Sequence, residues 1–234
     1  MEFYQKYKSI IKTILAFLLF FFSSLIILIP TSIFSIDLNT CSDLVYYSLR
    51  LFANLFMAAM LFLLFKKDII KDFKDFIHNF GSISDIAIKY WVIGLIVMAL
   101  SNQLIATFTP VKVAANEEGV QAIISSVPII SFVMTTFIAP FCEELIFRKS
   151  IRESIKSKIV FILVSGFVFG ALHVITSVTS LYDYLYIIPY SALGIAFAKI
   201  YVDTDNIFGS IFVHFLHNGI LTLLSILGTG MILW

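Results

Sequence analysis

The sequence predicts an all-α integral membrane protein with about seven transmembrane helices and one amphipathic helix on the cytoplasmic surface. Hydrophobic residues make up 60% of the 234 residues, and charged residues make up only 13%. Soluble domains average about a quarter charged residues and about half apolar ones. A chain of this length encloses too little interior to hide so much apolar surface from water. Composition therefore favours a membrane protein over a soluble one.

Seven apolar segments are long enough, or nearly so, to cross a hydrocarbon layer of ~30 Å, which requires a helix of about 20 residues. They cover residues 13–34, 44–65, 88–108, 121–147, 159–176, 184–202 and 206–228. No linker rich in Ser, Gly or Pro separates them, so we expect one continuous membrane domain. Within it, residues 1–120 supply the N-terminal helices and the amphipathic helix, and residues 121–234 form the core that carries the polar groups.

The first apolar segment follows Lys6, Lys8 and Lys12, as a signal peptide would. Its apolar run is longer than a signal-peptide core, and no small-residue cleavage site follows it. We therefore expect a retained first helix.

Lysine and arginine are distributed unevenly between the two predicted sides of the membrane. If the N-terminus is cytoplasmic, the cytoplasmic segments hold 14 of the 16 Lys and Arg residues, and only Lys112 and Arg50 lie elsewhere. Such asymmetry is typical of an N-terminus inside the cell. Seven crossings then place the C-terminus outside.

Residues 66–80 predict an amphipathic helix that lies on the cytoplasmic surface of the membrane. Lysines and aspartates alternate there with apolar residues at helical spacing, namely Ile69, Phe73, Phe76, Ile77 and Phe80. His78 belongs to the solvated face of this helix, and we expect no catalytic role for it.

Two classes of interpretation are disfavoured by charge and cysteine usage. No basic block lies outside the membrane flanks, so a nucleic-acid partner is not expected. Cys41 falls in a predicted outer loop and Cys142 in a membrane helix, so a disulfide between them is not expected either. Cys142 is better explained as a small packing residue than as a nucleophile, because an apolar setting disfavours the thiolate.

The fourth predicted helix carries ionisable groups, each of which costs about 2.5–3.5 kcal/mol at the centre of a membrane helix. Glu144 and Arg148 are spaced i, i+4 and can pair on one face, with the acid N-terminal to the base. Glu143 points about 100° away and has no partner in its own helix. The alternative is that both glutamates are interfacial charges near a basic helix end.

Two later helices carry histidines. Phe169 and His173 share a face of the fifth helix, where a lone histidine is usually a structural hydrogen-bonding residue. His214 and Asn218 share a face of the seventh helix, and His217 could replace either of them. Two histidines and an amide in one membrane helix are difficult to explain by packing.

Helix register connects these groups. The charged stretch 148–158 can extend the fourth helix to a turn near Ser157. Glu143 lies 14 residues before Ser157 and His173 lies 16 after it, so an antiparallel pair of helices places them at nearly the same depth. His214 lies about eight residues into a helix that also begins at the cytoplasmic side. We therefore expect the three helices to converge on one polar chamber that opens toward the cytoplasm.

A carboxylate, imidazoles and an amide in a dry site are suited to hydrolysis. The carboxylate can take a proton from water, and imidazole can orient that water or bind a metal. An amide or imidazole N–H can stabilise the oxyanion of a tetrahedral intermediate. A Glu and two His with an open coordination position also suit catalytic zinc (Zn).

These residues resemble the motifs of the CPBP family, the CAAX-protease and bacteriocin-processing membrane proteins that are also called Abi. That family carries EExxxR, FxxxH and HxxxN or HxxxD on successive membrane helices. All three motifs are intact and in order here, across roughly residues 121–220. The matching residues are Glu143, Glu144 and Arg148; Phe169 and His173; and His214 and Asn218.

The resemblance implies a helical membrane fold and an intramembrane endopeptidase in which Glu143 and His173 activate water. It implies that His214 and Asn218 hold the oxyanion, and that Glu144, Arg148 and Phe169 support the site. The family is classed with metalloproteases, although a metal-independent glutamate mechanism has also been argued. Zinc bound by Glu143, His173 and His214 is thus one of two alternatives, and His217 would add a ligand if it faces the chamber.

The implied substrate is a membrane-associated protein or peptide, such as a bacteriocin, a peptide signal or a CAAX-like protein. The short chain is most similar to bacterial members of the family, so we expect a multi-pass protein of a bacterial plasma membrane. One alternative is a non-catalytic bacteriocin-immunity or regulatory protein, which would not need all the costly polar groups. A transporter would show broken helices and internal repeats, and neither is clear in the sequence.

Overall fold

A computed structural model describes residues 2–228 of the chain, with side chains from residue 7 onward. Lys6 and residues 229–234, which entered the predictions of orientation and domain extent, lie outside the described side chains. The described part consists of helices and the loops that join them, without a β-strand. Seven of its helical stretches are long and apolar enough to cross a membrane, which confirms an all-α integral membrane protein.

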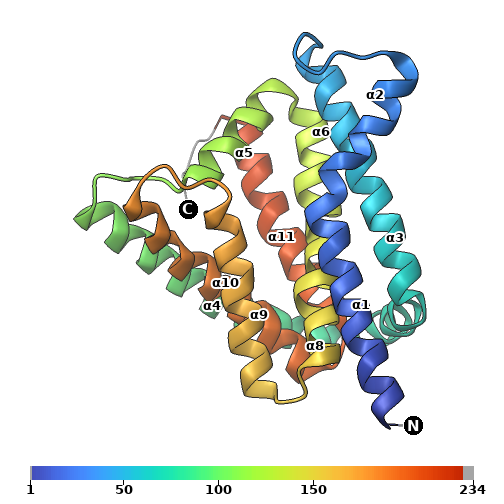
Figure 1. Ribbon diagram of the computed structural model, residues 1–234. Coiled ribbons are helices and arrows are strands. Elements are labelled where there is room, and N and C mark those ends of the chain that lie inside the picture. The colour runs from blue at the N-terminus through green and yellow to red at the C-terminus, as the bar shows by residue number, and fades with distance from the viewer. Residues whose placement is uncertain (1, 229–234) are drawn as a thin grey trace.

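The helices form a bundle of antiparallel neighbours (Figure 1). The first three spans are α1 (Glu2–Phe22) continued through a 3₁₀ turn into α2 (Leu28–Phe34), α3 (Asp43–His78) and α4 (Phe80–Phe108). The short α5 (Ala115–Ser126) precedes the fourth span, which contains α6 (Pro128–Val133), α7 (Ala139–Glu143) and α8 (Ile151–Ser154). The last three spans contain α9 (Lys158–Ile175), α10 (Ile187–Thr204) and α11 (Ile207–Ile226).

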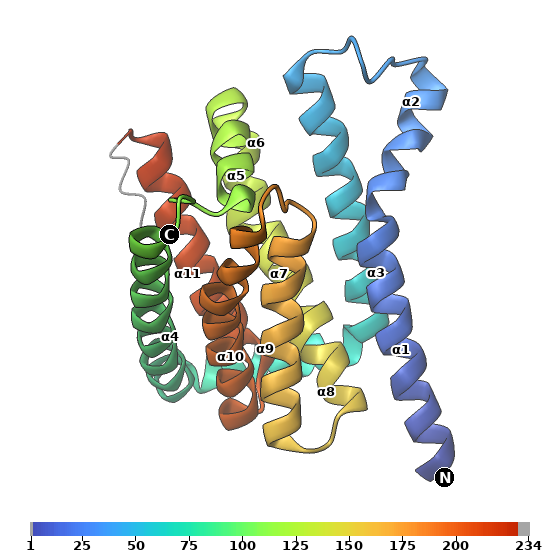
Figure 2. The ribbon, with the colours of Figure 1, turned by 60° about the vertical axis from the view of Figure 1, so that its left-hand side comes forward.

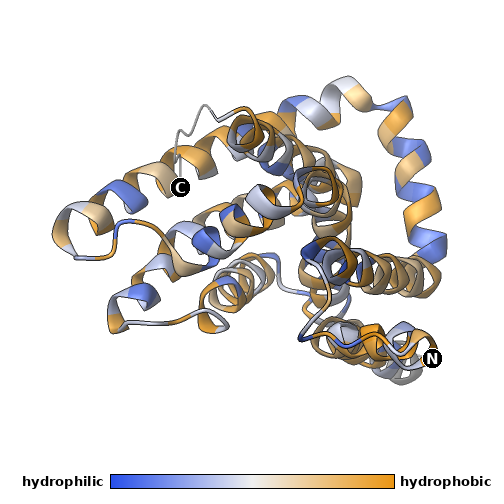
Figure 3. Cartoon of the chain, turned by 90° about the horizontal axis from the view of Figure 1, so that it is seen from above, coloured by the Kyte–Doolittle hydropathy of each residue, from blue (hydrophilic) through white to orange (hydrophobic). Residues whose placement is uncertain are grey.

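The outside of the bundle is apolar. Large hydrophobic side chains such as Phe21, Leu25, Leu163 and Phe167 remain more than half exposed. Seen from above, the helices accordingly carry the orange of hydrophobic residues over much of their length (Figure 3). Lipid tails can cover such a surface without cost, so the pattern fits a multi-pass membrane protein.

The predicted extent of the fourth helix, 121–147, is wrong at its N-terminal end. Val127 interrupts it with φ −140° and ψ 68°, and α6 begins at Pro128. A residue before proline is pushed out of the helical region by the proline ring, so a break at this position is expected physically. The predicted outer loop 109–120 is correspondingly shorter, because α5 begins at Ala115. At the other end the predicted extension is confirmed, since the span continues to Ser154 and Ser157 caps α9 by accepting a hydrogen bond from the Val160 N–H.

The predicted amphipathic helix 66–80 is not a separate element. It continues the second span without interruption as the C-terminal part of α3, and Figure 2 shows this teal part running across the end of the bundle. Its apolar face packs partly on protein: Ile69 is buried, and the rings of Phe73 and Phe76 lie 5.2 and 6.0 Å from that of Phe208 in α11. Its place on a membrane surface stays a prediction.

Segments that the charge pattern assigned to one side do share one end of the bundle. Lys12 of α1 lies 3.9 Å from the Asp68 carboxylate of α3 and 3.4 Å from that of Glu153 in α8. Lys149 lies 3.4 Å from Asp68. These ion pairs tie α1, α3 and α8 together beside the N-terminus (Figure 1). That this end is cytoplasmic stays a prediction.

Close packing between α9 and α10 depends on glycine. A Cβ atom on Gly170 would lie 2.6 Å from the Ser191 nitrogen and 2.8 Å from the Ile187 oxygen, and one on Gly166 would lie 2.9 Å from the Ile195 nitrogen. Backbone atoms cannot move aside as a flexible side chain can. The absence of a side chain at these positions therefore sets the distance at which α9 lies from α10.

Replacing Gly170 with alanine is expected to destabilise the protein by about 1–3 kcal/mol, because the added methyl group must push the two helices apart. Gly81→Ala in α4 is the matched control, since a Cβ there meets nothing within 4 Å. Alanine at an open helical position stabilises by roughly 0.5–1 kcal/mol. Thermal unfolding in detergent micelles, followed by circular dichroism, measures both changes; equal effects at the two glycines would contradict the packing argument.

Candidate active site

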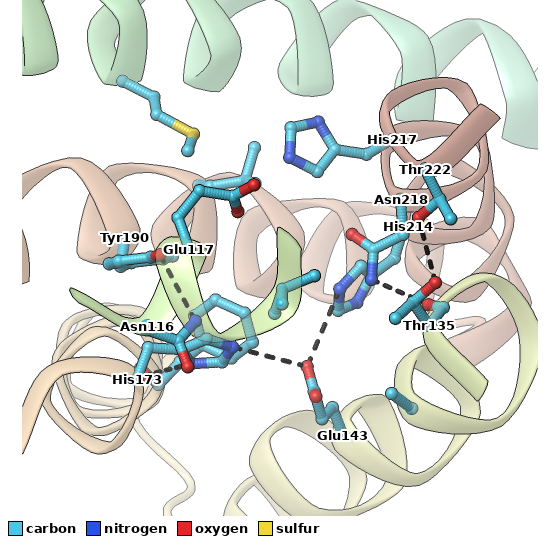
Figure 4. Close-up of a pocket in the computed structure, with 15 residues that line it drawn as sticks. Asn116, Glu117, Thr135, Glu143, His173, Tyr190, His214, His217, Asn218 and Thr222 are labelled. Atoms are coloured by element: carbon cyan, nitrogen blue, oxygen red, sulfur yellow. Dashed lines mark hydrogen bonds and ion pairs between the residues drawn. The ribbon is translucent and has the colours of Figure 1, made fainter. Parts of the chain in front are cut away.

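Three predicted site residues meet inside the bundle. Glu143 ends α7, His173 lies in the last turn of α9, and His214 lies in α11. The Glu143 Oε2 atom is 3.9 Å from His173 Nε2 and 3.7 Å from His214 Nε2 (Figure 4). The convergence expected from helix register is therefore present. Glu143 Oε2 itself makes no hydrogen bond to the described part of the chain.

Hydrogen bonds at the far side of each imidazole assign its tautomer. His173 Nδ1 lies 2.8 Å from the Phe169 carbonyl oxygen, and His214 Nδ1 lies 2.8 Å from Glu144 Oε1. A carbonyl and a carboxylate only accept, so both rings carry hydrogen on Nδ1. In the neutral form each ring then directs its Nε2 lone pair toward Glu143. A water molecule, which donates two hydrogen bonds, fits this arrangement. A proton between the groups fits it as well.

A buried ion pair supports this site. Arg148 Nη1 lies 3.0 Å from Glu144 Oε1, and both side chains are fully buried. The guanidinium lies over the rings of Phe169 and Phe197, at 4.4 and 5.3 Å from their centroids, and Nη2 donates to the Gly194 carbonyl. The predicted i, i+4 pairing is thus confirmed. It places a counter-charge behind the carboxylate that orients His214.

Asn218 lies beside His214 in the same pocket (Figure 4). Its amide nitrogen donates a hydrogen bond of 3.0 Å to the Thr135 carbonyl oxygen, and the Thr135 hydroxyl lies 2.9 Å from that of Thr222. A primary amide has two hydrogens to donate, so one is left for a ligand in the pocket.

The pocket itself has a volume of about 200 Å³ and extends from Glu143 to the short helix α5. Asn116 and Glu117 of α5 line it. Asn116 donates a hydrogen bond to the Tyr190 hydroxyl, and the Tyr190 ring stacks on His173 with centroids 5.1 Å apart. The pocket therefore lies nearer the end opposite the basic residues. That the chamber opens toward the basic, cytoplasmic end stays a prediction, because the lining residues give the depth of the pocket but not the end at which it opens.

His217 faces another part of the pocket from Glu143, across from Glu117 (Figure 4). The Trp91 indole donates to its Nδ1 at 3.4 Å. In the described part of the chain no group of three or more His, Cys, Asp or Glu side chains is arranged to hold a metal ion. The residues predicted to bind zinc, with or without His217, thus do not form a ligand set in this conformation, and zinc stays a prediction.

Several features of the site were not predicted. Residues 134–138 and 144–150 of the fourth span are π-helical, and π-helical turns are frequent at functional sites. Neither segment has a sequence signature, because their geometry follows from packing. Glu117 could have been noticed from its i, i+4 spacing to Gln121, although that pattern alone is weak.

Glu117 is a buried carboxyl group on α5, which is not one of the seven spans. Gln121 donates a hydrogen bond to it. Loss of hydration on burial nevertheless raises the pKa of Glu117 from its ordinary value near 4.5 to about 7. A raised pKa stabilises the folded state below pH 4.5, and that contribution is lost as the pH rises through 7.

The free energy of unfolding of wild type is therefore expected to fall between pH 5 and pH 8 by up to about 2–3 kcal/mol more than that of Glu117→Gln. Glu118→Gln, at the exposed neighbouring position, should keep the wild-type dependence. Unfolding titrations in micelles at the two pH values test this. Parallel pH profiles for wild type and Glu117→Gln would show that burial does not perturb this carboxyl.

The part of the chain that contains these site residues also matches known proteins. Residues 125–220 match the family model described as Rce1-like, type II CAAX prenyl endopeptidase. The chain is 28% identical over 145 residues to the "Putative membrane peptidase YdiL" of Bacillus subtilis, covering 58% of this chain and 56% of that protein. It is 30% identical over 134 residues to an uncharacterized protein of Mycoplasma capricolum, covering 53% of this chain and 38% of that protein.

A third relative is the "UPF0177 protein YxdF" of Lactococcus lactis, which is 27% identical over 131 residues, or 53% of this chain and 70% of that protein. The chain thus spans about half, or less, of the length of the first two relatives. No solved structure matches it.

Proposed function

This chain belongs to the CPBP, or CAAX-protease, family of membrane peptidases, and we propose that it is an intramembrane endopeptidase. The observation that carries the proposal is the convergence of the Glu143 carboxylate with the Nε2 atoms of His173 and His214 in one buried pocket. The family match over residues 125–220 includes all three residues.

In the proposed reaction a water molecule lies between Glu143 and His173. Glu143 takes one proton from this water as the oxygen attacks the peptide carbonyl, which forms a C–O bond and a tetrahedral oxyanion. The same proton then passes to the leaving nitrogen as the C–N bond breaks. Glu143 thereby returns to its ionised form.

The oxyanion is stabilised by His214 and Asn218. His214 donates from Nε2 when both of its nitrogens are protonated, and the Glu144 carboxylate holds the ring in place through Nδ1. Asn218 donates with the amide hydrogen that Thr135 does not use. Glu144, Arg148 and Phe169 hold these groups in place. If zinc were bound, Glu143, His173 and His214 would be the residues to hold it, and the metal would supply the acidity that activates water.

The proposed substrate is a membrane-associated protein or peptide: a bacteriocin, a peptide signal or a CAAX-like protein. The description of the matching family and the bacterial relatives support this class. We further propose a bacterial plasma membrane as the location, with the N-terminus and the basic end of the bundle in the cytoplasm.

The test compares membrane-associated peptides and new N-termini in host cells that carry wild type or Glu143→Ala at matched abundance. A cleavage product that appears only with wild type supports proteolysis and identifies the substrate. His173→Ala should remove the same product, and Glu118→Ala, an exposed glutamate outside the pocket lining, should retain it. Identical profiles, with the wild-type phenotype intact in the Glu143 variant, would instead favour a non-catalytic binding or immunity function.

A further inference from the structure

The pocket contains a second carboxylate with no assigned function. Glu117 is only 5% exposed, and it lines the pocket from α5, apart from Glu143 and across from His217 (Figure 4). The two carboxylates therefore belong to different parts of one cavity. A substrate whose peptide bond lies at Glu143 can therefore extend through this pocket toward Glu117.

Glu117 and Glu144 differ in whether a lysine or arginine lies beside the carboxylate. Glu144 is paired with Arg148, whereas the described residues that line this pocket include no lysine or arginine near Glu117. Gln121 donates a hydrogen bond to Glu117, but an amide carries no charge to balance a carboxylate. Apolar neighbours such as Val120 and Leu193 in the pocket lining add to the cost of an unbalanced charge. A cationic group supplied by a ligand would remove that cost.

Glu117 is also held in a fixed position. Gln121 contacts the Ser225 hydroxyl of α11 as well as Glu117, and Asn116 donates to the Tyr190 hydroxyl of α10. These contacts tie α5 to two of the helices that surround the reacting groups. A binding residue that is oriented by its own hydrogen bonds loses little freedom when a ligand arrives.

We propose that Glu117 determines specificity by binding a basic side chain, lysine or arginine, of the substrate residue next to the scissile bond. The inference rests on the proposed endopeptidase function and adds a substrate class to it. A charge-assisted hydrogen bond in a buried site discriminates strongly between a basic side chain and a neutral one of similar length.

The test uses the full-length protein in phosphatidylcholine vesicles and an equimolar library of lipid-anchored peptides with randomised central positions. Products are sequenced by mass spectrometry. For wild type we expect Lys and Arg to be enriched at one position beside the cut by at least about tenfold over Met and Gln. Glu117→Gln should abolish the enrichment, because glutamine keeps the shape and an acceptor but not the charge. Glu118→Gln, on the same helix and exposed, should retain it.

The readout is a ratio within one digestion, so a general loss of activity in a variant does not alter it. Cleavage without a preference for basic residues, or an equal preference in wild type and Glu117→Gln, overturns the inference while leaving the proteolytic function standing. If wild type cleaves no peptide, the result contradicts the proposed endopeptidase function. The inference is then decided by butylguanidinium, which should raise the melting temperature of the wild type and not that of Glu117→Gln; no difference between them overturns it.

Discussion

Replacing Arg148 with methionine is expected to lower the free energy of unfolding by about 3–5 kcal/mol, because it leaves Glu144 as an uncompensated charge in a fully buried site. The substitution also removes the guanidinium from the rings of Phe169 and Phe197 and from the Gly194 carbonyl. Methionine fills much of the same volume, so the loss reports on charge rather than on a cavity. Unfolding titrations in detergent micelles measure the effect.

Arg152→Met is the matched control. Arg152 is half-buried and donates to the carbonyl groups of Ile155 and Lys156 at the end of α8, so its loss should cost about 1 kcal/mol. The double variant Glu144→Gln/Arg148→Met should be more stable than Arg148→Met alone, because both charges are then gone. If Arg148→Met lowers the free energy of unfolding no more than Arg152→Met does, Glu144 is not ionised in the folded protein.

The parts of the structure that follow from local spacing were predictable from sequence. The hydrocarbon layer demands about 20 apolar residues per crossing, so hydropathy located the spans. The pairing of Glu144 with Arg148 follows from helical geometry alone. The approach of Glu143 to His173 followed from their similar distances to the turn at Ser157, because antiparallel helices of equal rise bring such residues to nearly the same depth.

The parts that depend on tertiary packing were not predictable. Helix rotation decides which residues of α11 face Glu143, and spacing could not separate His214, which does, from His217, which lies across from Glu117. The covering of the pocket by α5 depends on contacts such as that of Asn116 with Tyr190, more than 70 residues apart in the chain. Glu117 therefore becomes a site residue only in the folded protein. The continuity of α3 was missed because a change from apolar to amphipathic sequence alters the environment of a helix without breaking it.

Substitutions of the adjacent Glu143 and Glu144 should have different effects, on catalysis in the first case and on stability in the second. Glu143 makes no hydrogen bond through Oε2 to the described residues and is 18% exposed, whereas Glu144 is fully buried between Arg148 and His214. Glu144→Gln removes one partner of a buried ion pair and should destabilise the protein severely. Glu143→Gln removes a carboxylate that forms no ion pair with a lysine or arginine in the described part of the chain, so stability should change by less than about 1 kcal/mol.

Glu143→Gln should lower the rate of peptide cleavage by about 10²–10⁴-fold, because glutamine cannot accept the proton of the attacking water. Single-turnover cleavage of the substrate identified in cells measures this, alongside unfolding titrations on the same preparation. Since glutamine keeps the size and an acceptor oxygen, water can still bind between it and His173, and only proton transfer is lost. Full activity in Glu143→Gln would assign the base to another group, with His173 the nearest alternative. Loss of both folding and activity would instead make Glu143 a structural residue, and the difference between the neighbouring glutamates would disappear.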